Sequence, residues 1–212
     1  MAYKHFTCER WEKLWLSLGL SAPTGSFDDI LGRYTEPHRA YHGVRHIERC
    51  LDQFDGLGRL AERPELVELA LWLHDAVYDT RASDNEARSA DLSRRLLRDA
   101  GSPGLGDVVA AMIMATTHQD APPVGDAALV SDIDLSILGA DQDEYDAYTI
   151  EVRQEYSWVP EEAFRVGRLK VLKSIFSKGT FFHHKACAAL WEARAQENVR
   201  REMNVQMQKN RA

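Results

Sequence analysis

Cysteine is scarce in this chain of 212 residues: there are three, Cys8, Cys50 and Cys187, and they lie far apart. Their spacing excludes a Cys-x-x-Cys motif and argues against a disulfide framework, so we expect reduced thiols and a cytoplasmic protein. Long hydrophobic runs are missing too, because no stretch approaches the roughly 18 apolar residues of a membrane span. The N-terminus also lacks the basic and then apolar segments of a signal peptide.

Positive charge is the second shortage. The chain has 26 lysine and arginine residues against 33 aspartate and glutamate residues, which gives a net charge of −7. Nucleic-acid-binding domains normally show a basic patch. We therefore expect no dedicated nucleic-acid surface and no membrane partner.

The alternating pattern of β-strands is also missing, and helical periodicity dominates the chain. Apolar spacing and capping residues predict helices at about 8–18, 26–31, 43–54, 64–73, 83–97, 108–117, 141–156, 161–177 and 185–205, with a short segment at 129–138. The fold class that follows is all-α. We predict a single-domain helical bundle over residues 1–212, with a core at about 34–140 and C-terminal helices at about 141–205 packing on it.

The pair His74–Asp75 directly follows the apolar run at 69–73. Burying either polar side chain without a partner would be costly. A divalent cation would satisfy both, because imidazole nitrogen and carboxylate oxygen are metal ligands. Taken alone, the pair is explained equally well as two polar residues that end a core helix.

Two further places offer partners for this pair. His42 and His46 are four residues apart, so on a helix they would share a face, and the apolar stripe that follows turns His46 inward. Asp132 and Asp134 are embedded among apolar residues at 129–138. Two residues apart on a helix, their side chains point away from each other, so only one of them should be a ligand; caps or surface positions are the alternative.

The order His46, His74–Asp75, Asp134 resembles the HD superfamily of metal-dependent phosphohydrolases. The signature of that family is a histidine, a His-Asp doublet and a distant aspartate on helices of one bundle. The segment from Tyr41 to His46 is similar to the Tyr-His-Asn-x-x-His segment of cyclic-nucleotide phosphodiesterases, with Gly43 in place of the asparagine. Asp-Leu-Ser at 134–136 matches the same group.

The whole chain is also similar to a bacterial subfamily of small HD phosphohydrolases of unassigned substrate. This resemblance extends over nearly the full length, through the segments 34–39, 74–79, 84–90, 115–118, 132–139 and 192–198. It implies an HD-type bundle whose metal-binding core lies at about 34–140.

The resemblance implies a metal set of His46, His74, Asp75 and Asp134, where the Asp-Leu-Ser match favours Asp134 over Asp132. The cofactor would be a divalent metal ion, and this nitrogen and oxygen set accepts Mn, Fe, Zn, Co, Ni or Mg. The expected activity is hydrolysis of a phosphate mono- or diester in a nucleotide or another small phosphorylated metabolite. Asp75 would take part in catalysis, and His42 would protonate the leaving group, since histidines titrate near neutral pH.

Other polar residues are candidates for supporting roles. Arg39, His118 and Lys185 are candidate substrate contacts, because cationic side chains bind phosphate oxygens. Solvated charges are the alternative for Arg39 and Lys185, and a further metal ligand or a loop position is the alternative for His118. Asp79, four residues after Asp75, would orient a ligand from outside the metal set or else cap a helix, and Asp132 would have a similar outer position.

Two other functions compete with hydrolysis. A di-iron HD-type oxygenase would need further histidines between the doublet and the last aspartate, and His118 is the only one there. A non-catalytic sensor module would keep the metal site and bind a nucleotide without cleaving it.

Overall fold

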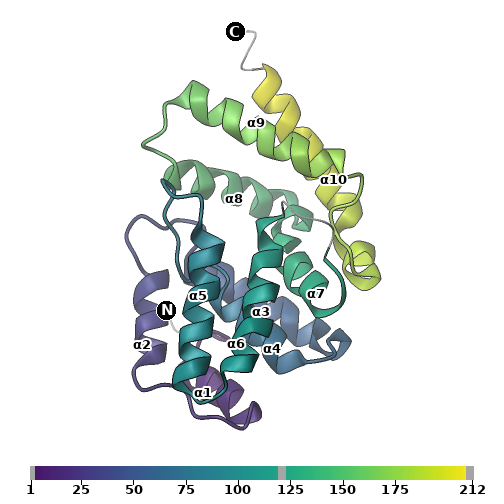
Figure 1. Cartoon of the computed structure of the whole chain (residues 1–212). Helices are drawn as coiled ribbons and strands as arrows, with labels where there is room; N and C mark the ends of the chain where they lie inside the picture. The colour runs from purple at the N-terminus through teal and green to yellow at the C-terminus, as the bar shows by residue number, and fades with distance from the viewer. Residues whose placement is uncertain (1–2, 119–122, 209–212) are drawn as a thin grey trace. The chain divides into compact units, whose positions relative to one another are not determined.

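The computed structural model describes residues 3–118 and 123–208, and within these ranges the chain is built of helices and loops without a β-strand (Figure 1). The prediction of an all-α fold is confirmed. In the described ranges, no helix is long and apolar enough to cross a membrane.

Contacts along the chain define two compact units, Met1–Asp134 and Leu135–Ala212. Their boundary falls near residue 140, where the sequence predicts a change from the core to the C-terminal helices. One domain over residues 1–212 stays a prediction.

The first unit has seven α-helices and two short 3-10 helices in its described part: α1 (Cys8–Ser17), α2 (Ser26–Tyr34), α3 (Val44–Leu57), η1 (Gly58–Leu60), α4 (Pro64–Leu73), α5 (Asn85–Asp99), α6 (Pro103–Met114), η2 (Ala115–Thr117) and α7 (Gly125–Asp134). Helix α4 is central, packing against α3, α6 and α7. From Leu66 to Leu73 all its residues except Glu68 are buried, as expected for a helix that is apolar on every side. The chain that leaves α4 therefore starts inside the unit.

An aromatic cluster fixes the last turn of α4. The ring centroid of Trp72 lies 4.5 Å from that of Phe6 and 5.2 Å from that of Trp11. The hydroxyl of Tyr34, the last residue of α2, donates a hydrogen bond to the Trp72 carbonyl at 3.0 Å. These contacts hold the helix end that precedes His74.

The second unit contains η3 (Leu135–Gly139), α8 (Gln142–Glu155), α9 (Glu161–Ser177) and α10 (Lys185–Gln208). The backbone of Gly139 packs so closely on Trp191 of α10 that a Cβ atom there would overlap it. Asn198 donates from its side-chain amide to the carbonyls of Leu138 and Ala140, at 2.9 and 3.0 Å. These contacts join η3 to α10.

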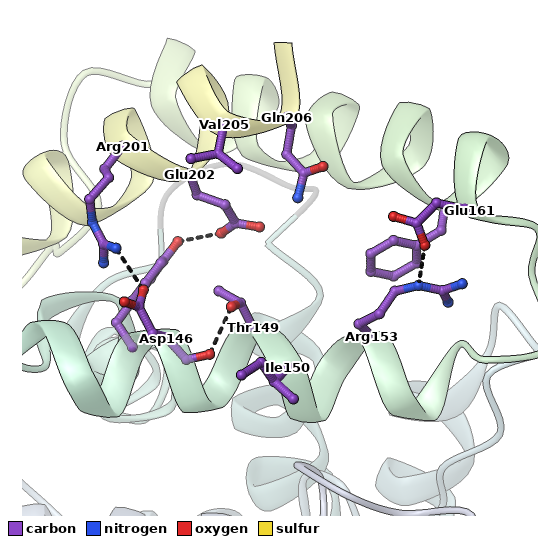
Figure 2. A pocket seen from close by; sticks show the side chains of 11 residues that line it. Asp146, Thr149, Ile150, Arg153, Glu161, Arg201, Glu202, Val205 and Gln206 are labelled. Atoms are coloured by element: carbon purple, nitrogen blue, oxygen red, sulfur yellow. Dashed lines mark hydrogen bonds and ion pairs between the residues drawn. The ribbon is translucent and has the colours of Figure 1, made fainter. Parts of the chain in front are cut away.

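A cavity of about 290 Å³ lies among the helices of the second unit (Figure 2). Four of its charged side chains form two ion pairs, and the fifth, Glu202, pairs with Arg168. Arg201 Nη1 lies 2.7 Å from Asp146 Oδ1, and Arg153 Nε lies 2.9 Å from Glu161 Oε2. Because these charged side chains already have partners within the protein, we interpret the cavity as a space left by the packing of the helices.

Candidate metal centre

His74 follows the last residue of α4 and turns its imidazole into the unit, where 1 % of the residue is exposed. Its Nδ1 atom lies 3.0 Å from the carbonyl oxygen of Leu71. A carbonyl can only accept a hydrogen bond, so Nδ1 carries a proton in this contact. In the neutral ring, Nε2 then holds a lone pair that can bind a cation.

His46 provides the second nitrogen from the first turn of α3. The apolar side chains of this helix, including Ile47 and Phe54, are buried and turn His46 inward, as the sequence predicts. Nε2 of His46 lies 3.0 Å from Nε2 of His74. The Nε2 atoms of the two imidazoles therefore face each other inside the first unit.

Two carboxylates complete the cluster. Oδ2 of Asp75 lies 3.2 Å from Nε2 of His74 and 3.4 Å from Nε2 of His46. Oδ1 of Asp134, the last residue of α7, lies 3.4 and 3.3 Å from the same two nitrogens. All four ligand atoms lie within 4.8 Å of one another. The structure thus brings the four predicted ligands together, with Asp134 rather than the fully buried Asp132 in the group.

The separations fit a metal ion. With bonds of about 2.05 Å, two ligand atoms lie about 3.3 Å apart at a tetrahedral angle and about 2.9 Å apart at a right angle. The five distances that involve a histidine nitrogen span 3.0 to 3.4 Å. The histidine side chains are 1 % exposed, whereas those of Asp75 and Asp134 are 15 % and 17 % exposed. The cluster is therefore closed on the histidine side and reachable on the carboxylate side.

The pKa values of the cluster residues indicate that the two carboxylates need positive charge beside them. Burial lowers the pKa of His74, but the carboxylates of Asp75 and Asp134 outweigh burial and hold this pKa well above its usual value. Burial raises the pKa of Asp75, but the two histidines outweigh it and hold the pKa well below 3.8. Protons on the imidazoles thus balance the carboxylates, and a cation can replace those protons.

His118 lies on the outer side of Asp134. Its Nε2 atom is 3.3 Å from Oδ2 of Asp134, and its Nδ1 atom is 3.3 Å from the hydroxyl of Ser131. Its φ of 54° makes it the only non-glycine residue with positive φ in the described ranges. This left-handed conformation costs about 1–2 kcal/mol. The contacts that hold it orient Asp134 toward the cluster, and direct contact with a substrate stays a prediction.

His42 lies in the turn before α3, so the shared helix face that its spacing from His46 suggested is absent. Its ring stacks on Tyr78 with centroids 4.2 Å apart, and its centroid lies 5.9 Å from that of His46. The two histidines are neighbours, but the turn rather than a shared helix face brings them together.

Arg39 is nearly buried, and its guanidinium bonds to the chain itself. Nη1 donates to the carbonyls of His42 and Asp75 at 2.9 and 2.6 Å, and Nη2 donates to that of Ala76 at 3.2 Å. Nε donates to Glu36 at 3.0 Å. Arg39 thus ties together the loops that carry His42 and Asp75, and its contact with a substrate phosphate stays a prediction.

Two other candidates lie outside the cluster. Because α4 ends at Leu73, Asp79 is not one helical turn from Asp75; its exposed carboxylate instead accepts a hydrogen bond from the N–H of Arg81 at 2.9 Å. Lys185 is the exposed first residue of α10 in the second unit. Their predicted roles at the site stay predictions.

The sequence reasoning missed two residues near the cluster. The thiol of Cys50 lies 3.9 Å from both ring nitrogens of His46, although its place in the apolar stripe of α3 predicted only packing. The pKa of Glu86, in the first turn of α5, is raised by burial and next by the charges of Asp75 and Asp134. The segment at 84–90 belongs to the family resemblance and could have drawn attention to Glu86.

Comparisons with protein-family models, curated proteins and solved structures found no match to this chain. The assignment of a function therefore depends on the residues of the cluster.

Proposed function

We propose that this chain is a metal-dependent phosphohydrolase of the HD type, which cleaves a phosphate mono- or diester of a nucleotide or another small phosphorylated metabolite. One observation carries the proposal: two imidazole nitrogens lie 3.0 Å apart, and one oxygen of each of two carboxylates lies 3.2 to 3.4 Å from both of them. They come from a histidine, a His-Asp doublet and a distant aspartate, the order that the HD signature has.

His46, His74, Asp75 and Asp134 would hold one divalent ion, and Mn, Fe, Zn, Co, Ni and Mg are all compatible with their nitrogen and oxygen atoms. When bound, such an ion lowers the pKa of a water molecule and polarises a phosphoryl oxygen, which is the chemistry that hydrolysis of a phosphate ester needs.

The surrounding residues would orient the reactants. The histidines are buried and block access to the cluster from their side. A substrate would therefore approach from the side of Asp75 and Asp134, whose side chains are partly exposed. There the Asp75 carboxylate can accept a hydrogen bond from the attacking water. His42, held by stacking on Tyr78, would donate a proton to the departing oxygen.

The test is metal analysis of the purified protein, followed by a phosphate-release screen across nucleotides and sugar phosphates. We expect bound metal and released phosphate in the wild type, and loss of both in His74→Ala and Asp75→Ala. Asp143→Ala, an exposed change in the first turn of α8, is the matched control and should behave as wild type. A metal-free wild type whose activity survives Asp75→Ala would contradict the proposal.

The same preparation distinguishes the two competing functions. Turnover that depends on oxygen, with the spectrum of a non-haem di-iron centre, would identify an oxygenase. Tight nucleotide binding by metal-loaded protein without phosphate release would identify a sensor module.

A further inference from the structure

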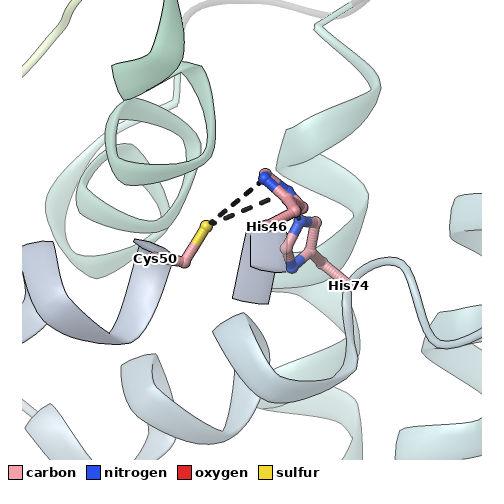
Figure 3. A group of neighbouring side chains, drawn as sticks. All are labelled: His46, Cys50 and His74. Atoms are coloured by element: carbon pink, nitrogen blue, oxygen red, sulfur yellow. Dashed lines mark hydrogen bonds between the residues drawn. The ribbon is translucent and has the colours of Figure 1, made fainter. Parts of the chain in front are cut away.

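A thiol lies beside the closed side of the cluster. Cys50 is one helical turn after His46 on α3, so both side chains point from the same face of that helix (Figure 3). Cys50 is fully buried, and its sulfur lies 3.9 Å from each ring nitrogen of His46. The ligand atoms of His46, Cys50 and His74 lie within 4.8 Å of one another.

These distances are close to those of a mixed nitrogen and sulfur site. With a metal–nitrogen bond of about 2.05 Å and a metal–sulfur bond of about 2.3 Å, the nitrogen and the sulfur are about 3.5 Å apart when the angle at the metal is near 109°. The observed 3.9 Å would have to shorten by about 0.4 Å. Because the sulfur is equally far from both nitrogens, it does not lie on the lone pair of either, and ligation would also require a small rotation of the side chains.

We propose that Cys50 is a ligand of the metal centre on its closed side, opposite the side from which a substrate approaches. On binding, the S–H bond breaks, the proton leaves to solvent, and the sulfur electron pair forms the bond to the ion. A thiolate favours soft and borderline ions over Mg²⁺ and Mn²⁺. The centre would thus select ions such as Zn²⁺ or Co²⁺. This inference rests on the metal centre of the proposed function.

Cobalt spectroscopy tests the inference without any activity measurement. Co²⁺ bound to nitrogen and oxygen shows d–d absorption, and a thiolate ligand adds a charge-transfer band in the near ultraviolet. We expect that band in the wild type and its loss in Cys50→Ser, with d–d absorption kept in both. Cys187→Ser, which changes the other fully buried cysteine, is the matched control and should keep the band.

The outcomes separate the two claims. Wild-type protein with d–d absorption but no charge-transfer band would overturn the role of Cys50 and leave the metal centre of the proposed function in place. Wild-type protein that binds no Co²⁺ would overturn both. If Cys50→Ser does not fold, cadmium NMR of the wild type decides, because a thiolate ligand moves the cadmium resonance strongly downfield and its absence overturns the inference.

Discussion

The Nδ1 atom of His74 lies 3.0 Å from the carbonyl oxygen of Leu71, three residues earlier in α4. This contact sets the tautomer of the imidazole and aims its Nε2 lone pair at the cluster. The last turn of an apolar core helix thus orients a candidate metal ligand with its own backbone. The doublet His74–Asp75 therefore does more than end a helix, because each of its side chains reaches the atoms supplied by α3 and α7.

The raised pKa values of His46 and His74 predict opposite effects of pH on the metal-free protein and on metal binding. A raised folded pKa gives stability that is complete below the usual value of 6.5 and is lost as pH rises through the folded pKa. The lowered pKa values of Asp75 and Asp134 give stability that is complete above 3.8 and is lost as pH falls through the folded pKa. Metal binding displaces protons from the histidines, so it strengthens as pH rises.

We therefore expect the melting temperature of chelator-treated protein to fall from mildly acidic to mildly alkaline pH, and the gain on adding Zn²⁺ or Mn²⁺ to grow over the same range. With free metal at about 100 times its Kd, the gain is about 2.7 kcal/mol. His74→Ala should abolish the gain. A gain that does not change with pH would contradict the coupling of protons and metal in this cluster.

The strained backbone of His118 gives a second prediction. His118→Gly removes the left-handed strain, which offsets the lost hydrogen bonds, so the unfolding free energy of metal-free protein should change by no more than about 1 kcal/mol. Metal affinity should nevertheless fall about 10–100-fold, because Asp134 loses the partner of its outer oxygen. Competition with a chromophoric chelator measures the affinity.

Ser131→Ala is the matched control for this change. It removes the partner of Nδ1 but leaves the contact with Asp134, so the loss of affinity should be smaller. Unchanged metal affinity in His118→Gly would show that Asp134 does not need His118.

The sequence was sufficient to predict most of the helices and, through the family resemblance, the four residues that meet in the cluster. The apolar residues on every side of α4 predicted that this helix is buried, and Pro64 begins it as predicted. The position of His74 at the end of the helix followed from these two predictions. The inward orientation of His46 followed from the stripe of α3. Both predictions depended on the apolar residues next to each histidine, because the burial of those residues decides where the histidine points.

The misses arose at helix ends and in tertiary contacts. Four-residue spacing related His42 to His46 and Asp79 to Asp75, but α3 begins at Val44 and α4 ends at Leu73, so helix geometry does not describe either pair. Periodicity could not distinguish Cys50 from an ordinary core residue, because its nearness to His74 arises from the packing of another part of the chain. The left-handed φ of His118 has no sequence signal, since the residue is not a glycine.

Arg39 gives a third prediction, which separates a structural role from phosphate binding. The single ammonium group in Arg39→Lys cannot donate to all three carbonyls that the guanidinium reaches. Denaturant unfolding should therefore show that the free energy of unfolding falls by about 1.5–3 kcal/mol. Arg33→Lys, in the exposed pair with Asp29, is the control and should change stability by less than about 0.5 kcal/mol. Unchanged stability of Arg39→Lys, with a raised KM, would instead assign the guanidinium to the substrate.

The proposed proton donation by His42 predicts a dependence on the leaving group. An alkoxide needs a proton to depart, whereas a nitrophenolate leaves without one. His42→Ala should therefore lower kcat about 10²–10⁴-fold for a nucleotide or sugar phosphate, and far less for a nitrophenyl phosphate ester. Metal content should not change, because His42 is outside the group of four ligands.

The control for this change is His38→Ala. His38 is more exposed and contacts the same Tyr78 through the carbonyl, at 2.9 Å, so a mere disturbance of that loop should appear in both variants. Steady-state kinetics on the two kinds of ester decide between the roles. Equal losses on both esters would mean that His42 acts through its stacking on Tyr78 and not as the proton donor, because a packing defect weakens catalysis whatever group departs.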